Sequence, residues 1–162
     1  MNQKPTLYLM CGLPGSGKTT LAKELEQEAP AIRLTPDEWM TPLYGATICE
    51  SNSLDRWNTA HDRIEKIQWQ LAERALLLGV SVVLDFGVWS REEREGFRNR
   101  ATALGARSEL IFLDEPLDVL KERVAARNEL PGQGTYPISA ADLEQWWAIF
   151  QRPSHDELAV RE

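Results

Sequence analysis

Short apolar runs alternate with helical stripes along the whole chain. Two runs, residues 7–11 and 80–85, are continuous and bounded by turn residues, as in strands buried on both faces. Longer segments repeat apolar residues every three or four positions, as amphipathic helices do. This alternation predicts right-handed strand–helix–strand units, and therefore an α/β fold whose parallel sheet is covered on both faces. The expected strands are 7–11, 31–34, 80–85 and 109–114, and the expected helices include 16–28, 54–78, 90–105, 116–128 and 139–150.

Local signals refine these elements. A serine or threonine followed three residues later by an acid predicts a helix start through a capping box. Residues 40–53 have no clear period and are expected to be irregular. The long central helix is expected to bury one stripe: Trp57, Ala60, Ile64, Ile67, Leu71, Ala75 and Leu78. The capping pairs are Thr35 with Glu38, Ser90 with Glu93, and Ser139 with Asp142.

Composition fits one globular domain over residues 1–162. Hydrophobic residues make up 43% of the 162 residues and charged residues 27%. Cys11 and Cys49 are too few for a disulfide framework, so we expect free thiols and a cytoplasmic protein. The first apolar run is far shorter than the roughly 20 residues of a membrane span, and no signal peptide or membrane contact is expected.

A phosphate-binding motif lies between the first strand and the first helix, where its chemistry requires it. The pattern G-x-x-x-x-G-K-[ST] uses glycines to turn backbone N–H groups toward a phosphate at the positive end of a helix. Its lysine can bridge the β- and γ-phosphates, and its hydroxyl can ligate Mg²⁺. The sequence thus predicts binding of a nucleoside triphosphate, ATP or GTP, with Mg²⁺. The expected binding residues are Gly12, Leu13, Pro14, Gly15, Ser16, Gly17, Lys18, Thr19 and Thr20.

Several classes of protein bind such nucleotides. A GTPase should carry the guanine-reading Asn/Thr-Lys-x-Asp motif, which is absent. Residues 110–116 are similar to the Walker B strand of transporter ATPases, but that class also needs a Ser-Gly-Gly signature. We therefore interpret Asp114 and Glu115 as acids at a strand end and helix start, where they complement the helix dipole. A kinase and a nucleotide-gated binding module remain.

Phosphoryl transfer needs a metal ligand, a base and cations around the transferred group. Asp85 ends an otherwise apolar strand and is the candidate Mg²⁺ or water ligand beside Thr19. Asp37 either complements a helix dipole or accepts the proton of an acceptor hydroxyl. Arg123 and Arg127 lie four residues apart, a repulsive spacing that an anion would relieve, as in a lid over phosphates.

Other polar and aromatic residues have weaker signals. Arg91 and Arg94 oppose a helix dipole, which would favour an anionic ligand, and Arg152 is a further candidate lid contact. His61 is interpreted as structural. Trp39 and Trp89 follow the two candidate catalytic strands and either rim an acceptor pocket or belong to the core.

These motifs occur in the order found in P-loop kinases. The chain resembles the group that contains polynucleotide 5′-kinase, zeta toxins and chloramphenicol phosphotransferase, and is similar to AAA-domain ATP-binding proteins. The resemblance implies a parallel sheet of order 2-3-1-4-5 with five, or four, strands. It also implies that Asp37 is the base and that Arg123 and Arg127 belong to a lid at about residues 121–140.

Two departures and the charge distribution bear on the acceptor. Polynucleotide kinases carry Arg-Asp-Asp and Asp-Thr-Asn where this chain has residues 35–37 and 85–87. The chain has 18 basic and 25 acidic residues, a net charge of −7, whereas nucleic-acid binding favours a basic surface. We therefore expect a kinase for a hydroxyl of a neutral or cationic small molecule, such as an antibiotic or metabolite. The alternatives are a polynucleotide or nucleotide-sugar kinase and a binding module with little turnover.

Overall fold

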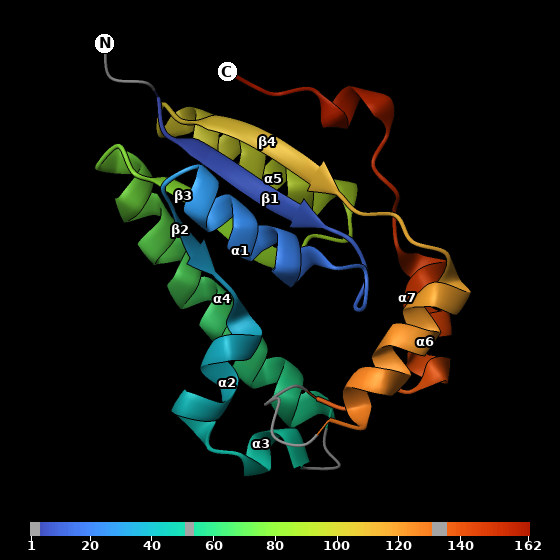
Figure 1. The fold of residues 1–162 in the computed structure, drawn as a ribbon. Helices are drawn as coiled ribbons and strands as arrows, with labels where there is room; N and C mark the ends of the chain where they lie inside the picture. Colours follow the sequence, from blue (N-terminus) through green and yellow to red (C-terminus); the bar gives the residue numbers. More distant parts are fainter. Residues whose placement is uncertain (1–3, 51–53, 131–135) are drawn as a thin grey trace.

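A computed structural model describes residues 4–50, 54–130 and 136–162 (Figure 1). Its strands form one sheet in which every neighbouring pair is parallel, in the order β2-β3-β1-β4. The predicted α/β class and the order of the first four strands are confirmed, and the described residues form four strands. The strands are β1 (Thr6–Cys11), β2 (Ala31–Leu34), β3 (Ser81–Gly87) and β4 (Arg107–Phe112).

Helices cover both faces of this sheet. In Figure 1, α1 lies in front of the strands, while α4 and α5 lie behind them, and α6 and α7 pack together beyond the carboxyl end of β4. None of the described helices is both long and apolar enough to cross a membrane. The helices are α1 (Lys18–Glu28), α2 (Pro36–Tyr44), α3 (Thr47–Glu50), α4 (Leu54–Leu77), α5 (Arg91–Ala103), α6 (Leu117–Asn128), α7 (Ala140–Ile149) and a 3₁₀ helix, η1 (His155–Leu158).

The two faces of the sheet have different cores. Side chains alternate along a strand, so Leu9 and Cys11 of β1 face one way and Met10 faces the other. The Leu9 side packs against α4 and α5 through Trp69 and other apolar residues, and the Met10 side packs against α1 around Ala22. Both faces of β1 are therefore dry, which explains why its sequence is a continuous apolar run.

Residues 40–50 of the segment expected to be irregular are largely helical, and residues 51–53 lie outside the described residues. α2 continues to Tyr44 through an internal proline, Pro42, and α3 follows at once. Met40 and Ile48 from this segment bury themselves against Ile64 of α4. The prediction was wrong because burial against a distant helix, rather than local periodicity, stabilises these turns. Ser90 and Ser139 cap α5 and α7 as predicted.

The stripe predicted on α4 is only partly buried. Ala60, Ile64 and Ala75 lie in the core, but Ile67 and Leu71 are half exposed and Leu78, past the helix end, is 81% exposed. The most deeply buried row has four-residue spacing instead, and runs through Ile64, Gln68, Ala72 and Leu76. A repeat of three or four residues fits either row, so the periodicity alone could not choose between them.

A C-terminal clamp, residues 151–161, occupies the edge of the sheet beside β4 where a fifth strand was expected. It makes one antiparallel bridge, between Ser108 and Arg161, and no longer strand in the described residues. Arg98 of α5 donates hydrogen bonds to the backbone carbonyls of Glu157 and Ala159. Side chains of α5 therefore donate hydrogen bonds to backbone carbonyls of this segment, in place of the backbone hydrogen bonds of a β ladder.

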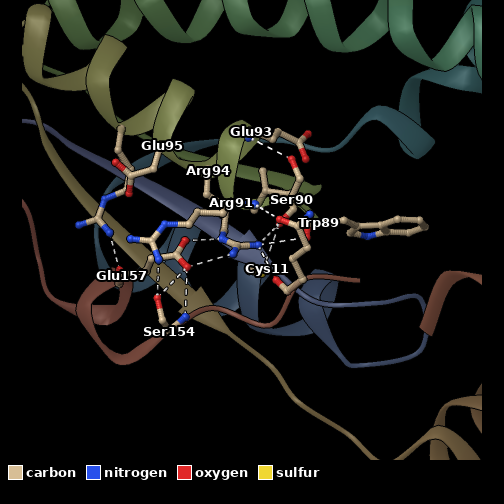
Figure 2. Close-up of polar contacts among 12 residues, drawn as sticks. Cys11, Trp89, Ser90, Arg91, Glu93, Arg94, Glu95, Ser154 and Glu157 are labelled. Carbon is tan, nitrogen blue, oxygen red and sulfur yellow. Dashed lines mark hydrogen bonds and ion pairs between the residues drawn. The ribbon is translucent and has the colours of Figure 1, made fainter. Parts of the chain in front are cut away.

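Arg94 of α5 holds this clamp in place through its side chain (Figure 2). Its guanidinium pairs with both oxygens of Glu157, at 2.7 and 3.1 Å, and both side chains are almost wholly buried. It also donates to the carbonyls of Val88, Trp89 and Gln151, and so connects the loop after β3 to the chain after α7. Val88 has a left-handed backbone (φ 33°), which a β-branched residue rarely adopts without such support.

The prediction of an anionic ligand at Arg91 and Arg94 is therefore wrong, because carboxylates of the chain itself pair with both arginines. Glu157 pairs with Arg94, and the exposed Asp156 pairs with Arg91 at 2.7 Å. Burial alone would raise the pKa of Glu157, but hydrogen bonds from Arg94 and from the backbone of Ser154 outweigh it and lower that pKa.

We expect Glu157→Gln to destabilise the fold by about 3 kcal/mol, because it leaves the Arg94 charge buried without a carboxylate. Chemical denaturation followed by tryptophan fluorescence measures this. Since the pKa of Glu157 is lowered, its contribution is present at neutral pH and is lost as the pH falls through the folded-state pKa. The matched control, Asp156→Asn, breaks an exposed pair and should leave the unfolding midpoint nearly unchanged. Equal midpoints for the two variants would contradict this role of the buried pair.

Candidate active site

The phosphate loop connects β1 to α1 at the carboxyl edge of the sheet. Gly15 and Gly17 have positive φ angles of 85° and 93°, which let the backbone turn where a side chain would be strained. The Gly12 amide donates to the carbonyl of Gly87 at 3.1 Å, which fixes the loop to β3. Lys18 Nζ crosses the loop and donates to the Leu13 carbonyl at 2.9 Å. This is a cradle of backbone N–H groups at a helix N-terminus, with a lysine beside it.

Thr19, Asp85 and Thr35 meet beside this cradle. Thr19 Oγ1 donates to Asp85 Oδ2 at 2.6 Å, and Thr35 Oγ1 donates to the same oxygen at 3.2 Å. Burial raises the pKa of Asp85, although both hydroxyls and the Lys18 charge oppose the rise. Hydroxyl and carboxylate oxygens are ligands suited to Mg²⁺, and the cation would compensate this buried carboxylate. Thr19 and Asp85 thus fit the predicted metal site.

The contact of Thr35 with Asp85 corrects one prediction. Thr35 does precede α2, but its hydroxyl makes no capping bond. The side chain of Glu38, the other half of the expected capping box, accepts a hydrogen bond from Arg33 at 2.9 Å instead. Pro36 at the first helical position and the acids Asp37 and Glu38 in the first turn remain as start signals.

Asp37 lies at the start of α2, next to His61 of α4. Its Oδ1 is 3.4 Å from Nε2 of His61, and Nδ1 of His61 is 3.6 Å from Oε1 of Glu65. Burial lowers the pKa of His61, but the bond to Asp37 and the charges of Glu65, Asp37 and Asp62 raise it overall. Burial raises the pKa of Glu65 to about 7. Sequence reasoning missed this cluster: the spacing of His61 and Glu65 is visible, but the packing of α2 on α4 is not.

Lys18 and Arg127 also lie within electrostatic range of Asp37. Burial lowers the pKa of Lys18, and the carboxylates of Asp85 and Asp37 partly restore it. Arg127 of α6 has its Nε and Nη2 groups buried without a hydrogen-bond partner in the described part of the chain. Burial lowers its pKa, and Asp37 is the charge that opposes this. Two cations and a carboxylate from three separate elements therefore share one site.

Arg123 occupies a different position from Arg127. It donates to the Gly15 carbonyl at 3.1 Å and pairs with Glu115 at 3.3 Å, so it fastens α6 to the outside of the phosphate loop. A methyl group added to Gly15 would lie 3.1 Å from Val124 of α6, which shows how closely the two elements approach. Residues 131–135 of the expected lid lie outside the described residues.

The remaining candidates are accounted for by packing. Asp114 pairs with Arg152 at 3.3 Å, and that arginine stacks over Trp147 at 4.1 Å. Trp39 and Trp89 are half-buried against the main core. The aromatic ring beside the Asp37 cluster is Trp57, which stacks on His61 with a centroid distance of 4.7 Å.

Comparisons with known proteins agree with this geometry. A family model described as an AAA domain matches residues 7–153. The bifunctional enzyme NodQ of Rhizobium tropici is 35% identical over 127 residues, which are 75% of this chain. The chain spans only 19% of the length of that curated relative.

Solved structures share the fold at low sequence identity. A chain of the Pnkp1/Rnl/Hen1 RNA repair complex has a TM-score of 0.70 and 21% identity over 91% of this chain and 44% of its own. A gluconokinase from Sinorhizobium meliloti 1021 has a TM-score of 0.63 and 18% identity over 95% and 79%. Kti12 of Chaetomium thermophilum, in complex with ADP-AlF3, has a TM-score of 0.65 and 19% identity over 91% and 81%. Since the family model spans most of the chain and the fold agrees, the chain belongs to the AAA domain family and has the fold of a P-loop kinase.

Proposed function

We propose that this chain is an ATP- and Mg²⁺-dependent phosphotransferase that transfers the γ-phosphoryl group to a hydroxyl of a small molecule. One observation carries the proposal. Asp37, a carboxylate whose side chain is partly exposed, shares a site with the cations Lys18 and Arg127 beside the phosphate loop. A protein that only bound nucleotide would need the cations but not the carboxylate.

On the nucleotide side, the backbone amides of the phosphate loop would bind the β-phosphate, and Lys18 would bridge the β- and γ-phosphates. Mg²⁺, held by Thr19 and directly or through water by Asp85, would neutralise charge on these phosphates. Arg127 would give its two unpartnered N–H groups to the γ-phosphate, whose charge would also relieve the cost of burying the guanidinium.

On the acceptor side, Asp37 would act as the base. The acceptor hydroxyl gives its proton to a carboxylate oxygen of Asp37, and its oxygen forms a bond to the γ-phosphorus. The bond from that phosphorus to the bridging oxygen breaks, and ADP leaves with the electron pair. Asp37 then returns the proton to solvent, since its side chain is 42% exposed.

The charges around Asp37 support a neutral or cationic acceptor. The charges of Asp62, Glu93 and Asp37 all act on Glu65, and His61 is the cation that faces Glu65. A nucleic-acid strand would bring phosphates into this field, which disfavours it. The polynucleotide acceptor is kept as the second candidate because the Pnkp1 complex shares the fold.

The proposal is tested by ADP release with a panel of acceptors: sugars, amino sugars, hydroxyl-bearing antibiotics, nucleosides and 5′-hydroxyl oligonucleotides. Release stimulated by a small acceptor supports the proposal. Stimulation by oligonucleotides alone supports the second candidate. Tight ATP binding without stimulation by any acceptor would instead indicate a nucleotide-gated binding module.

Two variants should separate binding from transfer. Lys18→Ala removes the phosphate cation and should abolish measurable ATP binding or turnover. Asp37→Asn keeps the shape of the base but cannot accept the proton, and should lower kcat by about 100-fold or more while ATP affinity stays nearly unchanged. Isothermal titration and stopped-flow ADP detection measure the two quantities. Full transfer activity in Asp37→Asn would show that Asp37 is not the base.

Arg127→Met should lower the activity and raise the stability of the protein. The loss of charge at the γ-phosphate should lower kcat by about 100-fold or more. Because the unpartnered N–H groups disappear, the free energy of unfolding should rise by about 1 kcal/mol. Arg74→Met, at an exposed arginine on α4, is the matched control and should change neither quantity. Unchanged turnover in Arg127→Met would exclude this contact with the transferred group.

A further inference from the structure

His61 is held on three sides at the acceptor end of the site. Its Nε2 faces Asp37 Oδ1 at 3.4 Å and its Nδ1 faces Glu65 Oε1 at 3.6 Å. The ring of Trp57 stacks on one face of the imidazole, with 24° between the planes. Only 19% of the His61 side chain is exposed. An imidazole with both nitrogens and one face engaged has a fixed orientation.

This fixed ring acts on one particular oxygen of Asp37. The imidazole faces Oδ1 of Asp37, so we assign the other carboxylate oxygen, Oδ2, to the acceptor hydroxyl. Asp37 lies in the first turn of α2, and Met40 of α2 packs with Ile48 of α3 and Ile64 of α4 in a small buried cluster. The helix packing therefore sets the distance between the two residues, and the imidazole sets the plane of the carboxylate.

We propose that His61 is a positioning residue for phosphoryl transfer: it orients Asp37 so that Oδ2 faces the acceptor hydroxyl, and Glu65 orients His61 from behind. This inference rests on the proposed function, because it assumes that Asp37 is the base. It assigns to His61 and Glu65 a role that neither the phosphate loop nor the arginines of α6 can supply.

The charge of the imidazole should appear in the pH dependence. The acids that face His61 are Asp37 from α2 and Asp62 and Glu65 from α4, with Glu93 of α5 acting on Glu65. Together they raise the pKa of His61 against the effect of its burial. The imidazolium is present below that pKa and is lost as the pH rises through it. Turnover should then decline on the alkaline side as the ion pair with Asp37 disappears.

The pairing is tested first without any acceptor. Histidine side-chain NMR is simple here because the chain has two histidines, and His155→Gln, at an exposed position, assigns the signals. Asp37→Asn removes the charge opposite Nε2 and should lower the titration midpoint of His61. An identical titration midpoint of His61 in wild type and Asp37→Asn would overturn the proposal, regardless of the turnover measured for either protein.

Turnover with the best acceptor of the panel then tests the positioning role. His61→Ala should lower kcat by about 100-fold with little change in the KM for ATP, because a misplaced base affects the chemical step. His61→Gln can place an amide N–H near the position of Nε2, and should recover at least tenfold of that loss. Because the amide does not titrate, the alkaline decline should be absent in this variant. His155→Gln, the matched control, should keep the wild-type kcat and pH profile.

The outcomes separate the two proposals. An inactive Asp37→Asn together with a His61→Ala of wild-type kcat and pH profile would overturn the role of His61 and leave the base assignment intact. Full activity in Asp37→Asn would overturn the base assignment and, with it, the positioning role. Loss of kcat in both His61→Ala and His61→Gln with equal pH profiles would indicate a purely structural histidine and also overturn the proposal.

Discussion

The parallel direction of all four strands is the constraint on which the site depends. Because every strand points the same way, the segments after β1, β2 and β3 emerge at one edge of the sheet. The segment after β1 supplies Lys18, and the segment after β2 supplies Thr35 and Asp37. Asp85 lies close to the carboxyl end of β3 itself. Residues separated by up to 66 positions in the chain, such as Thr19 and Asp85, thereby meet within hydrogen-bond distance. An antiparallel pair would send half of these groups to the opposite edge.

The site also contains buried polar groups that destabilise the fold. The buried cation Arg94 is fully paired with Glu157. Among the described residues, Arg127 instead keeps buried N–H groups at Nε and Nη2 without a partner, and the buried carboxylate of Asp85 accepts hydrogen bonds from two hydroxyls on its Oδ2. Local violations of good packing chemistry concentrate at functional sites, because a ligand is expected to complete them. The residues whose buried polar groups lack full hydrogen bonding are thus the ones that we expect a nucleotide and its metal to contact.

Much of the fold and part of the site could be predicted from the sequence. The phosphate loop, Asp85 and the parallel sheet have local signatures, since each depends on residues within one strand–loop–helix segment. His61, Thr35 and the Arg94–Glu157 pair have none, because each acquires its partner only through packing of distant elements. The burial of one row of α4 rather than another depends on the sheet that it covers. These interactions are set by tertiary structure, and periodicity carries no information about them.

The clamp at Arg94 has a consequence for the order of folding. Arg94 and Glu157 are 63 residues apart, and closing so long a loop precedes any gain from the contact. Until residues 151–161 dock, Arg94 of α5 lacks its buried carboxylate, and Arg98 lacks the carbonyls of Glu157 and Ala159 as acceptors. The four strands and α1 all precede the clamp in the chain, so they are synthesised before it. On a ribosome, the nascent chain would therefore expose the strand edge of β4 until residues 151–161 emerge and dock beside it.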